Sequence, residues 1–245
     1  MAIWGTLIGT AAGMLLGGPL GALAGAAAGS AADLALQQRA AASGSGRRQV
    51  AFTIAAIALA AKMARADGDA TDAEFATFQR LFQVPEAERS NATRFYRLAQ
   101  GSVAGFEAYA DQAAALLGRG SPVLEDLIEA LLLIAKTDGV KPEELAYLDA
   151  VAARFGFTAG DYARIRARHL PSGDGVGRDD PYAVLGVEAG APPEVVRAAY
   201  RALVKTTHPD RHMADGTPLE FIKVAEARMA ALNAAYAAIM PKGHA

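Results

Sequence analysis

Apolar residues recur at three- and four-residue steps along most of the chain, which is the period of an amphipathic α-helix rather than of a β-strand. Two stretches with linker composition interrupt this pattern, one ending in Ser43-Gly44-Ser45-Gly46 and one at residues 171–178. We therefore predict an all-α protein. Its predicted parts are an apolar segment (1–38), a central helical domain (47–170), a linker (171–178) and a C-terminal domain (179–245).

The N-terminal segment has no charged residue from Ala2 to Ala32, which exceeds the roughly 20 apolar residues that cross a bilayer. This predicts a single transmembrane helix. A spacer of small residues with little drive to insert is one alternative, and a re-entrant hairpin broken at Gly17-Gly18-Pro19 is another. A cleaved signal peptide is disfavoured, because no charged residue precedes the apolar run.

Glycines stand four residues apart throughout this segment, as overlapping GxxxG units. In lipid such spacing lets two helix backbones approach closely, so it predicts a homodimer formed through the transmembrane helix. The stripe consists of Gly5, Gly9, Gly13, Gly17, Gly21, Gly25 and Gly29. Arg39, Arg47 and Arg48 follow the segment and no charged side chain precedes it, so the remainder of the chain is expected to face the cytoplasm.

Composition narrows the range of functions. The 24 basic and 26 acidic residues give a net charge of −2, which argues against a nucleic-acid partner. The chain contains no cysteine, so disulfides and thiolate chemistry are excluded.

The central domain contains two related passages, in which an apolar helix pattern leads to an Asp-Gly turn and then to a second helix. The first turn is Asp67-Gly68 and the second is Asp138-Gly139. We interpret them as a duplicated helix–turn–helix, and they resemble the TerB domain. That resemblance implies acidic sites for a divalent cation, formed by Asp67, Asp69, Glu74, Asp138, Glu143 and Glu144. Solvated turn carboxylates and helix caps are the competing interpretation.

The C-terminal domain begins near Asp179 with a short apolar segment, Tyr182-Ala183-Val184-Leu185-Gly186-Val187. Pro192-Pro193-Glu194 then starts a helix that ends just before His208-Pro209-Asp210. A second long helix is predicted from about Leu219. The two helices are expected to pack as an antiparallel hairpin with the His-Pro-Asp tripeptide at its tip.

These motifs occur in the order found in the J-domain of the DnaJ family, which this domain resembles. The resemblance implies that the tripeptide binds a DnaK-type ATPase chaperone and promotes its ATP hydrolysis, with no catalytic residue in this chain. Pro209 would limit the entropy lost on docking, and Asp210 would accept charge-assisted hydrogen bonds. The partner-binding residues are His208, Pro209, Asp210, Arg197, Arg201, Lys205 and Arg211, whose cations would steer an acidic partner.

The order of anchor, TerB-like region and J-domain resembles the DjlA type of membrane co-chaperone. The resemblance implies a co-chaperone of the bacterial inner membrane that is not an enzyme and needs no cofactor, apart from a divalent cation in the TerB-like domain. The alternative function is a membrane-attached, metal-binding stress-response module in which the hairpin is incidental.

Overall fold

The computed structural model describes Gly18 and residues 44–66, 72–82, 84, 86, 89–101, 105–170, 180–207 and 222–240. Every regular element in these residues is a helix, as the apolar periodicity predicted. The central domain contains α4 (Gly44–Met63), α5 (Asp72–Leu81), α6 (Arg89–Ala99), α7 (Phe106–Leu117), α8 (Pro122–Ala135), α9 (Pro142–Phe155) and α10 (Ala159–Ala167). The C-terminal domain contains α11 (Pro181–Leu185), α12 (Pro193–Thr207) and α14 (Ile222–Ile239).

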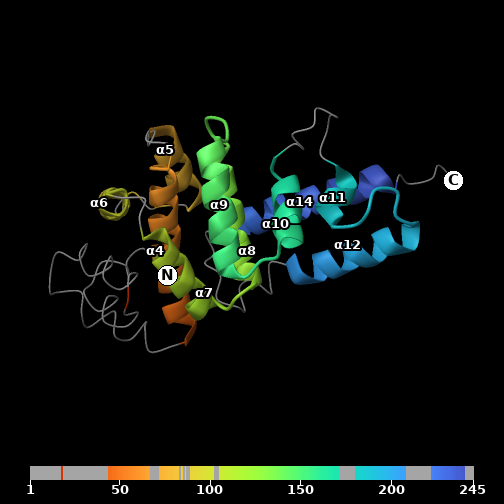
Figure 1. Cartoon of the computed structure of the whole chain (residues 1–245), viewed down its shortest axis with the longest axis horizontal. Coiled ribbons are helices and arrows are strands. Elements are labelled where there is room, and N and C mark those ends of the chain that lie inside the picture. Colours follow the sequence, from red (N-terminus) through yellow and green to blue (C-terminus); the bar gives the residue numbers. More distant parts are fainter. Residues whose placement is uncertain are drawn as a thin grey trace.

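Helix α4 lies at the centre of its domain, where it packs against α6, α7, α8 and α9 (Figure 1). The sequence dictates this position, because no charged residue occurs from Gln49 to Ala61 and a helix that is apolar all round must be buried. Its many alanines allow close approach of the surrounding helices. Tyr147 of α9 then fixes one neighbour by donating a 3.0 Å hydrogen bond from its hydroxyl to the Leu59 carbonyl.

Local signals set the bounds of α8 and α9. Ser121 caps α8, since its hydroxyl accepts the Leu124 N–H at 3.4 Å, and Pro122 occupies the first helical position. Pro142 begins α9, and Gly156 ends it with a φ of 88°, a conformation that favours glycine. The two predicted helix pairs, α4 with α5 and α8 with α9, are both present.

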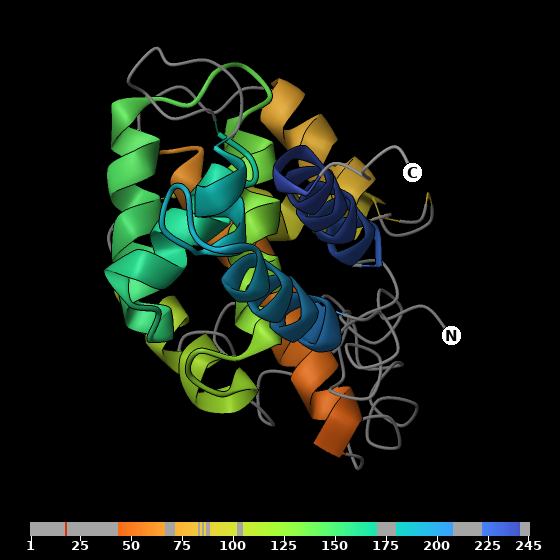
Figure 2. The same cartoon turned by 90° about the vertical axis from the view of Figure 1, so that its right-hand side faces the viewer.

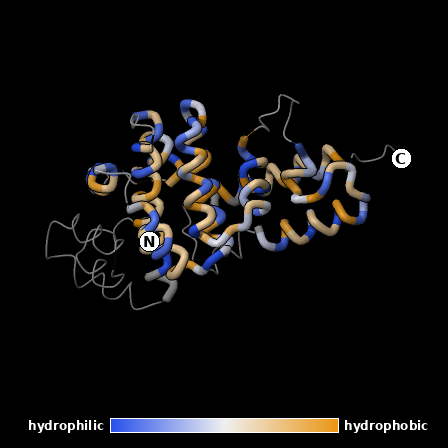
Figure 3. The backbone as a smooth tube through the Cα atoms, in the orientation of Figure 1, coloured by the Kyte–Doolittle hydropathy of each residue, from blue (hydrophilic) through white to orange (hydrophobic). Residues whose placement is uncertain are grey.

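Hydrophobic and hydrophilic residues interleave along most helices of both domains (Figure 3), as is typical of helices with one apolar face. No helix among the described residues is both long and apolar enough to cross a membrane. Apart from Gly18, the predicted transmembrane helix lies outside the described residues, and so does its whole glycine stripe.

The two domains lie side by side along the long axis of the molecule, with α10 between them (Figure 1). Helix α10 contacts α8 and α9 of its own domain and also α11. Helix α14 contacts α8, and its Val224 is buried in the central core. The first turn of α14 therefore packs against the central domain and not within the predicted hairpin.

Candidate functional site

The C-terminal hairpin has a small apolar core of its own. Tyr200 of α12 stacks on Tyr236 of α14 with ring centroids 4.2 Å apart, and the Tyr200 hydroxyl donates a 2.7 Å hydrogen bond to Asn233 Oδ1. Figure 2 looks onto this end of the molecule and shows the two helices in front of the central domain. The core comprises Val184, Leu185, Val196, Leu232 and Ala235. These contacts fix how α12 is presented.

Three basic side chains of α12 face the solvent. Arg197, Arg201 and Lys205 are exposed at four-residue steps, as the sequence predicted for a basic face. The Arg201 Nε donates a 3.2 Å hydrogen bond to the Arg197 carbonyl, which lays the guanidinium along the helix. Within the described residues no carboxylate pairs with these three cations, so their charge is available to a partner.

Helix α12 ends at Thr207, immediately before the tripeptide. The basic face of α12 therefore directly precedes the tripeptide in the chain. Several predicted residues lie outside the described residues, namely His208, Pro209, Asp210, Arg211, Asp67, Asp69 and the seven glycines of the stripe.

Helices α5 and α9, which follow the two Asp-Gly sequences in the chain, bring a pair of carboxyl groups together. Glu74 of α5 and Glu144 of α9 are almost completely buried and form a hydrogen bond with each other. Glu144 also caps α9, since its Oε2 accepts the Lys141 N–H at 3.0 Å. By contrast, Glu143 and Asp138 are exposed. Among the described residues no group of three or more histidine, cysteine or acidic side chains is arranged to hold a metal ion.

This pair is chemically suited to sharing a proton. Burial and the neighbouring Glu74 carboxylate raise the pKa of Glu144 to about 7. Burial and the same two carboxyl groups also raise the pKa of Tyr96, whose hydroxyl is buried nearby. The Tyr96 phenol therefore keeps its proton at neutral pH.

The chain is similar to curated proteins named "Co-chaperone protein DjlA". It is 30% identical to that of Shewanella oneidensis over 123 residues, covering 46% of this chain and 47% of the relative, and 41% identical to that of Mannheimia succiniciproducens over 58 residues, covering 24% and 20%. These matches span about half or less of the relatives' own length. A longer match, to the protein of Vibrio cholerae, is 29% identical over 226 residues and covers 80% of this chain and 79% of the relative.

Three family models match the chain in succession. The model described as "Co-chaperone DjlA transmembrane domain" matches residues 1–42, "Tellurite resistance protein TerB" matches 53–167, and "DnaJ domain" matches 180–239. The chain is a DjlA-like protein. The DnaJ match of this DjlA-like chain covers α11, α12 and α14, so the hairpin is its J-domain. No solved structure was found to match the chain.

Sequence reasoning on this DjlA-like chain missed a buried cluster of charges between its two domains. Arg228 of α14 is nearly completely buried, and its guanidinium reaches α8 of the TerB domain. Its Nη2 lies 2.6 Å from Asp126 Oδ1, and its Nε lies 2.9 Å from Glu129 Oε2. Glu125 Oε2 lies 4.0 Å from its Nη1. No local signal marks these residues, because the partners are about a hundred positions apart in the chain.

The end of α10 completes this cluster. The buried Arg168 bonds to Glu125 and Glu129, and His169 Nε2 lies 3.5 Å from Glu129 Oε1. Burial alone would raise the pKa of Glu129, but Arg228, His169 and Arg168 hold it well below its usual range. Burial alone would likewise lower the pKa of Arg228, and the three carboxylates raise it instead. All the carboxylates around Arg228 therefore stabilise its charged form.

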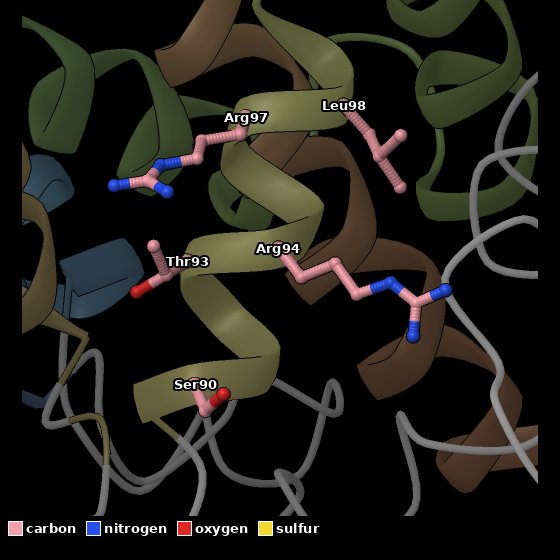
Figure 4. A pocket seen from close by; sticks show the side chains of 5 residues that line it. All are labelled: Ser90, Thr93, Arg94, Arg97 and Leu98. Atoms are coloured by element: carbon pink, nitrogen blue, oxygen red, sulfur yellow. The ribbon is translucent and has the colours of Figure 1, made fainter.

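A surface pocket on α6 does not form a second site in this DjlA-like chain. It has a volume of about 500 Å³ and is lined by Ser90, Thr93, Arg94, Arg97 and Leu98. Figure 4 shows that Arg94 and Arg97 extend to opposite sides of the helix. Because their guanidinium groups diverge, they do not converge on one anion.

Proposed function

We propose that this DjlA-like chain is a membrane-anchored co-chaperone that recruits a DnaK-type ATPase and stimulates its ATP hydrolysis. The observation that carries the proposal is the exposed basic face of α12, which ends immediately before His208-Pro209-Asp210. Cations on this face attract an acidic partner, and Asp210 accepts its hydrogen bonds. The chain acts by recognition, and the chemistry takes place in the partner.

A single-turnover ATPase assay with a DnaK-type partner and the full-length chain in detergent or nanodiscs tests this proposal. We expect His208→Gln to abolish stimulation while circular dichroism and melting temperature stay nearly unchanged. His212→Gln is the matched control, because it removes an imidazole four residues away but leaves the tripeptide intact. Full stimulation by folded His208→Gln would refute the mechanism.

The location of this activity is part of the proposal. The match of residues 1–42 to a transmembrane-domain family, together with the uncharged run from Ala2 to Ala32, supports a single-pass anchor in the bacterial inner membrane. The arginines after that run favour a cytoplasmic position for both folded domains. The glycine stripe supports a homodimer formed within the bilayer.

The carboxyl pair supports a second candidate function, divalent-cation binding by the TerB domain. Glu74 and Glu144 come from the two repeated passages, and their buried carboxyl groups lie next to each other. A divalent cation bound between them would replace the proton that they share. Titration of the full-length chain with Ca²⁺ and with Mg²⁺, followed by calorimetry at pH 8, tests this. Binding that Glu144→Gln removes would support a cation site, and the absence of binding by the parent protein would eliminate it.

A further inference from the structure

Helix α14 packs on two different domains along its length. Near its start Val224 is buried in the central core, and Arg228 one turn later reaches α8. Among the side chains that the structure describes, the part of α14 that builds the J-domain core begins at Leu232. Figure 1 shows α14 extending from the central domain along the J-domain. The half of α14 that follows residues 208–221 in the chain is therefore attached to the TerB domain.

This attachment is specific because it is made by buried charges. The Arg228 guanidinium bonds to Asp126 at 2.6 Å and to Glu129 at 2.9 Å, and all three side chains are almost completely buried. Arg168 and His169 of the central domain also lie against Glu129, so Arg228 is the part of the cluster that the J-domain contributes. A neutral side chain at position 228 would take a cation away from buried carboxylates, which strongly disfavours the docked arrangement.

The docked arrangement leaves the basic face of α12 accessible. Helix α12 makes its main contacts with α11 and α14, which both belong to the J-domain. Arg197, Arg201 and Lys205 are exposed while α14 is docked on α8. Docking of α14 is therefore compatible with an acidic partner on the basic face.

We propose that the docked arrangement is the one that the DnaK-type partner binds, and that Arg228 is a positioning residue that maintains it. The inference rests on the proposed function. The tripeptide belongs to the segment that joins α12 to α14, and the TerB domain holds the start of α14. Holding that end in advance reduces the conformational freedom that the J-domain loses when the partner binds. If only the docked arrangement binds, the apparent affinity falls in proportion to the docked fraction.

The test uses the full-length chain in nanodiscs and two measurements. Stimulation of the partner ATPase is recorded against co-chaperone concentration, and hydrogen exchange reports the protection of α8 and α14. Arg228→Gln should speed exchange in α8 and at the start of α14. It should also raise the half-maximal concentration about tenfold, as expected if the docked fraction falls to about a tenth. Maximal stimulation should stay near that of the parent protein, because a saturating partner restores the docked arrangement.

Further readouts separate positioning from a folding defect of the J-domain. The salt dependence of the half-maximal concentration should match that of the parent protein, because Arg228→Gln leaves the basic face of α12 unchanged. Adding Asp126→Asn to Arg228→Gln removes a buried charge whose cation has been lost, and should partly restore the half-maximal concentration. A change in the TerB domain would not repair a misfolded J-domain. Glu226→Gln, an exposed change on α14, should alter neither measurement.

The parent protein with saturating partner provides the opposing test. Protection of α8 should not decrease when the partner binds, and faster exchange there would show that the partner displaces the J-domain, which overturns the inference. Arg228→Gln that undocks without weakening stimulation would overturn it too, and so would unchanged exchange in that variant. The proposed function survives each of these results provided that the parent protein stimulates and His208→Gln does not. A parent protein that stimulates no better than His208→Gln would refute the proposed function itself.

Discussion

At the scale of single residues, two buried glutamates of the central domain, Glu129 on α8 and Glu144 on α9, have opposite charge states. Glu129 is kept charged by surrounding cations, whereas Glu144 lies beside another carboxyl group and is kept protonated up to nearly neutral pH. The same side-chain chemistry thus acts as an ion at one position and as a neutral hydrogen-bonding group at the other, because its neighbours differ in sign.

Glu144 gives the protein a predictable dependence on pH. The pKa of Glu144 is about 7 in the folded protein and 4.5 in an unfolded chain. Between pH 4.5 and pH 7 the native state therefore holds a proton that the unfolded state has lost. This contribution to stability is present at low pH and is lost as the pH rises from about 4.5 to about 7. Glu144→Gln should therefore raise the melting temperature at pH 8 by several degrees, reflecting up to about 3 kcal/mol, and should have less effect near pH 5.

Thermal unfolding followed by circular dichroism at both pH values measures this difference. Glu143→Gln removes a neighbouring carboxyl group that is exposed, and it should change neither melting temperature. A Glu144→Gln variant that is less stable than the parent at pH 8 would contradict the shared proton and favour a required negative charge.

At the scale of helices, the sequence was sufficient wherever a helix makes its contacts locally. Helix α12 begins at Pro193, ends before His208 and exposes Arg197 and Arg201. These features follow from its apolar periodicity and from the proline in its first turn. Helix α8 shows the limit. Its apolar face was predicted, but Asp126 and Glu129 are also buried, because their partner Arg228 comes from a distant helix. Periodicity would place those carboxylates in solvent, since it contains no information on distant neighbours.

The exposed basic face of α12 should affect the rate at which the chain associates with its partner. Arg201→Glu should slow association of the full-length chain with a DnaK-type partner several-fold at low salt, and the difference should shrink as salt screens the charges. Stopped-flow fluorescence over a range of ionic strength measures it. Arg94→Glu on α6 changes the net charge equally at an exposed position of the central domain and is the matched control. Equal rates for both variants at every salt concentration would remove local steering from the mechanism.

At the scale of the whole molecule, the position of the J-domain depends on two kinds of attachment. One is the docking of α14 on α8, where buried charges and Val224 join the domains. The other is the covalent connection to residues 1–42, which match a transmembrane-domain family and directly precede α4 in the sequence. An anchor that self-associates would bring two J-domains near the same patch of membrane and raise their effective concentration for one partner.

The glycine stripe makes that arrangement testable. Replacing Gly9, Gly13 and Gly17 together by leucine should preserve or strengthen insertion, because leucine is more apolar, while its bulk separates the helices and lowers self-association. A dimerisation reporter in a bacterial inner membrane, read beside membrane fractionation, separates the two effects. Replacing Ala11 and Ala22 by leucine adds bulk off the stripe and should leave association intact. If the glycine variant inserts and associates as strongly as the parent, the stripe is not the dimer face, and the segment acts as an anchor alone.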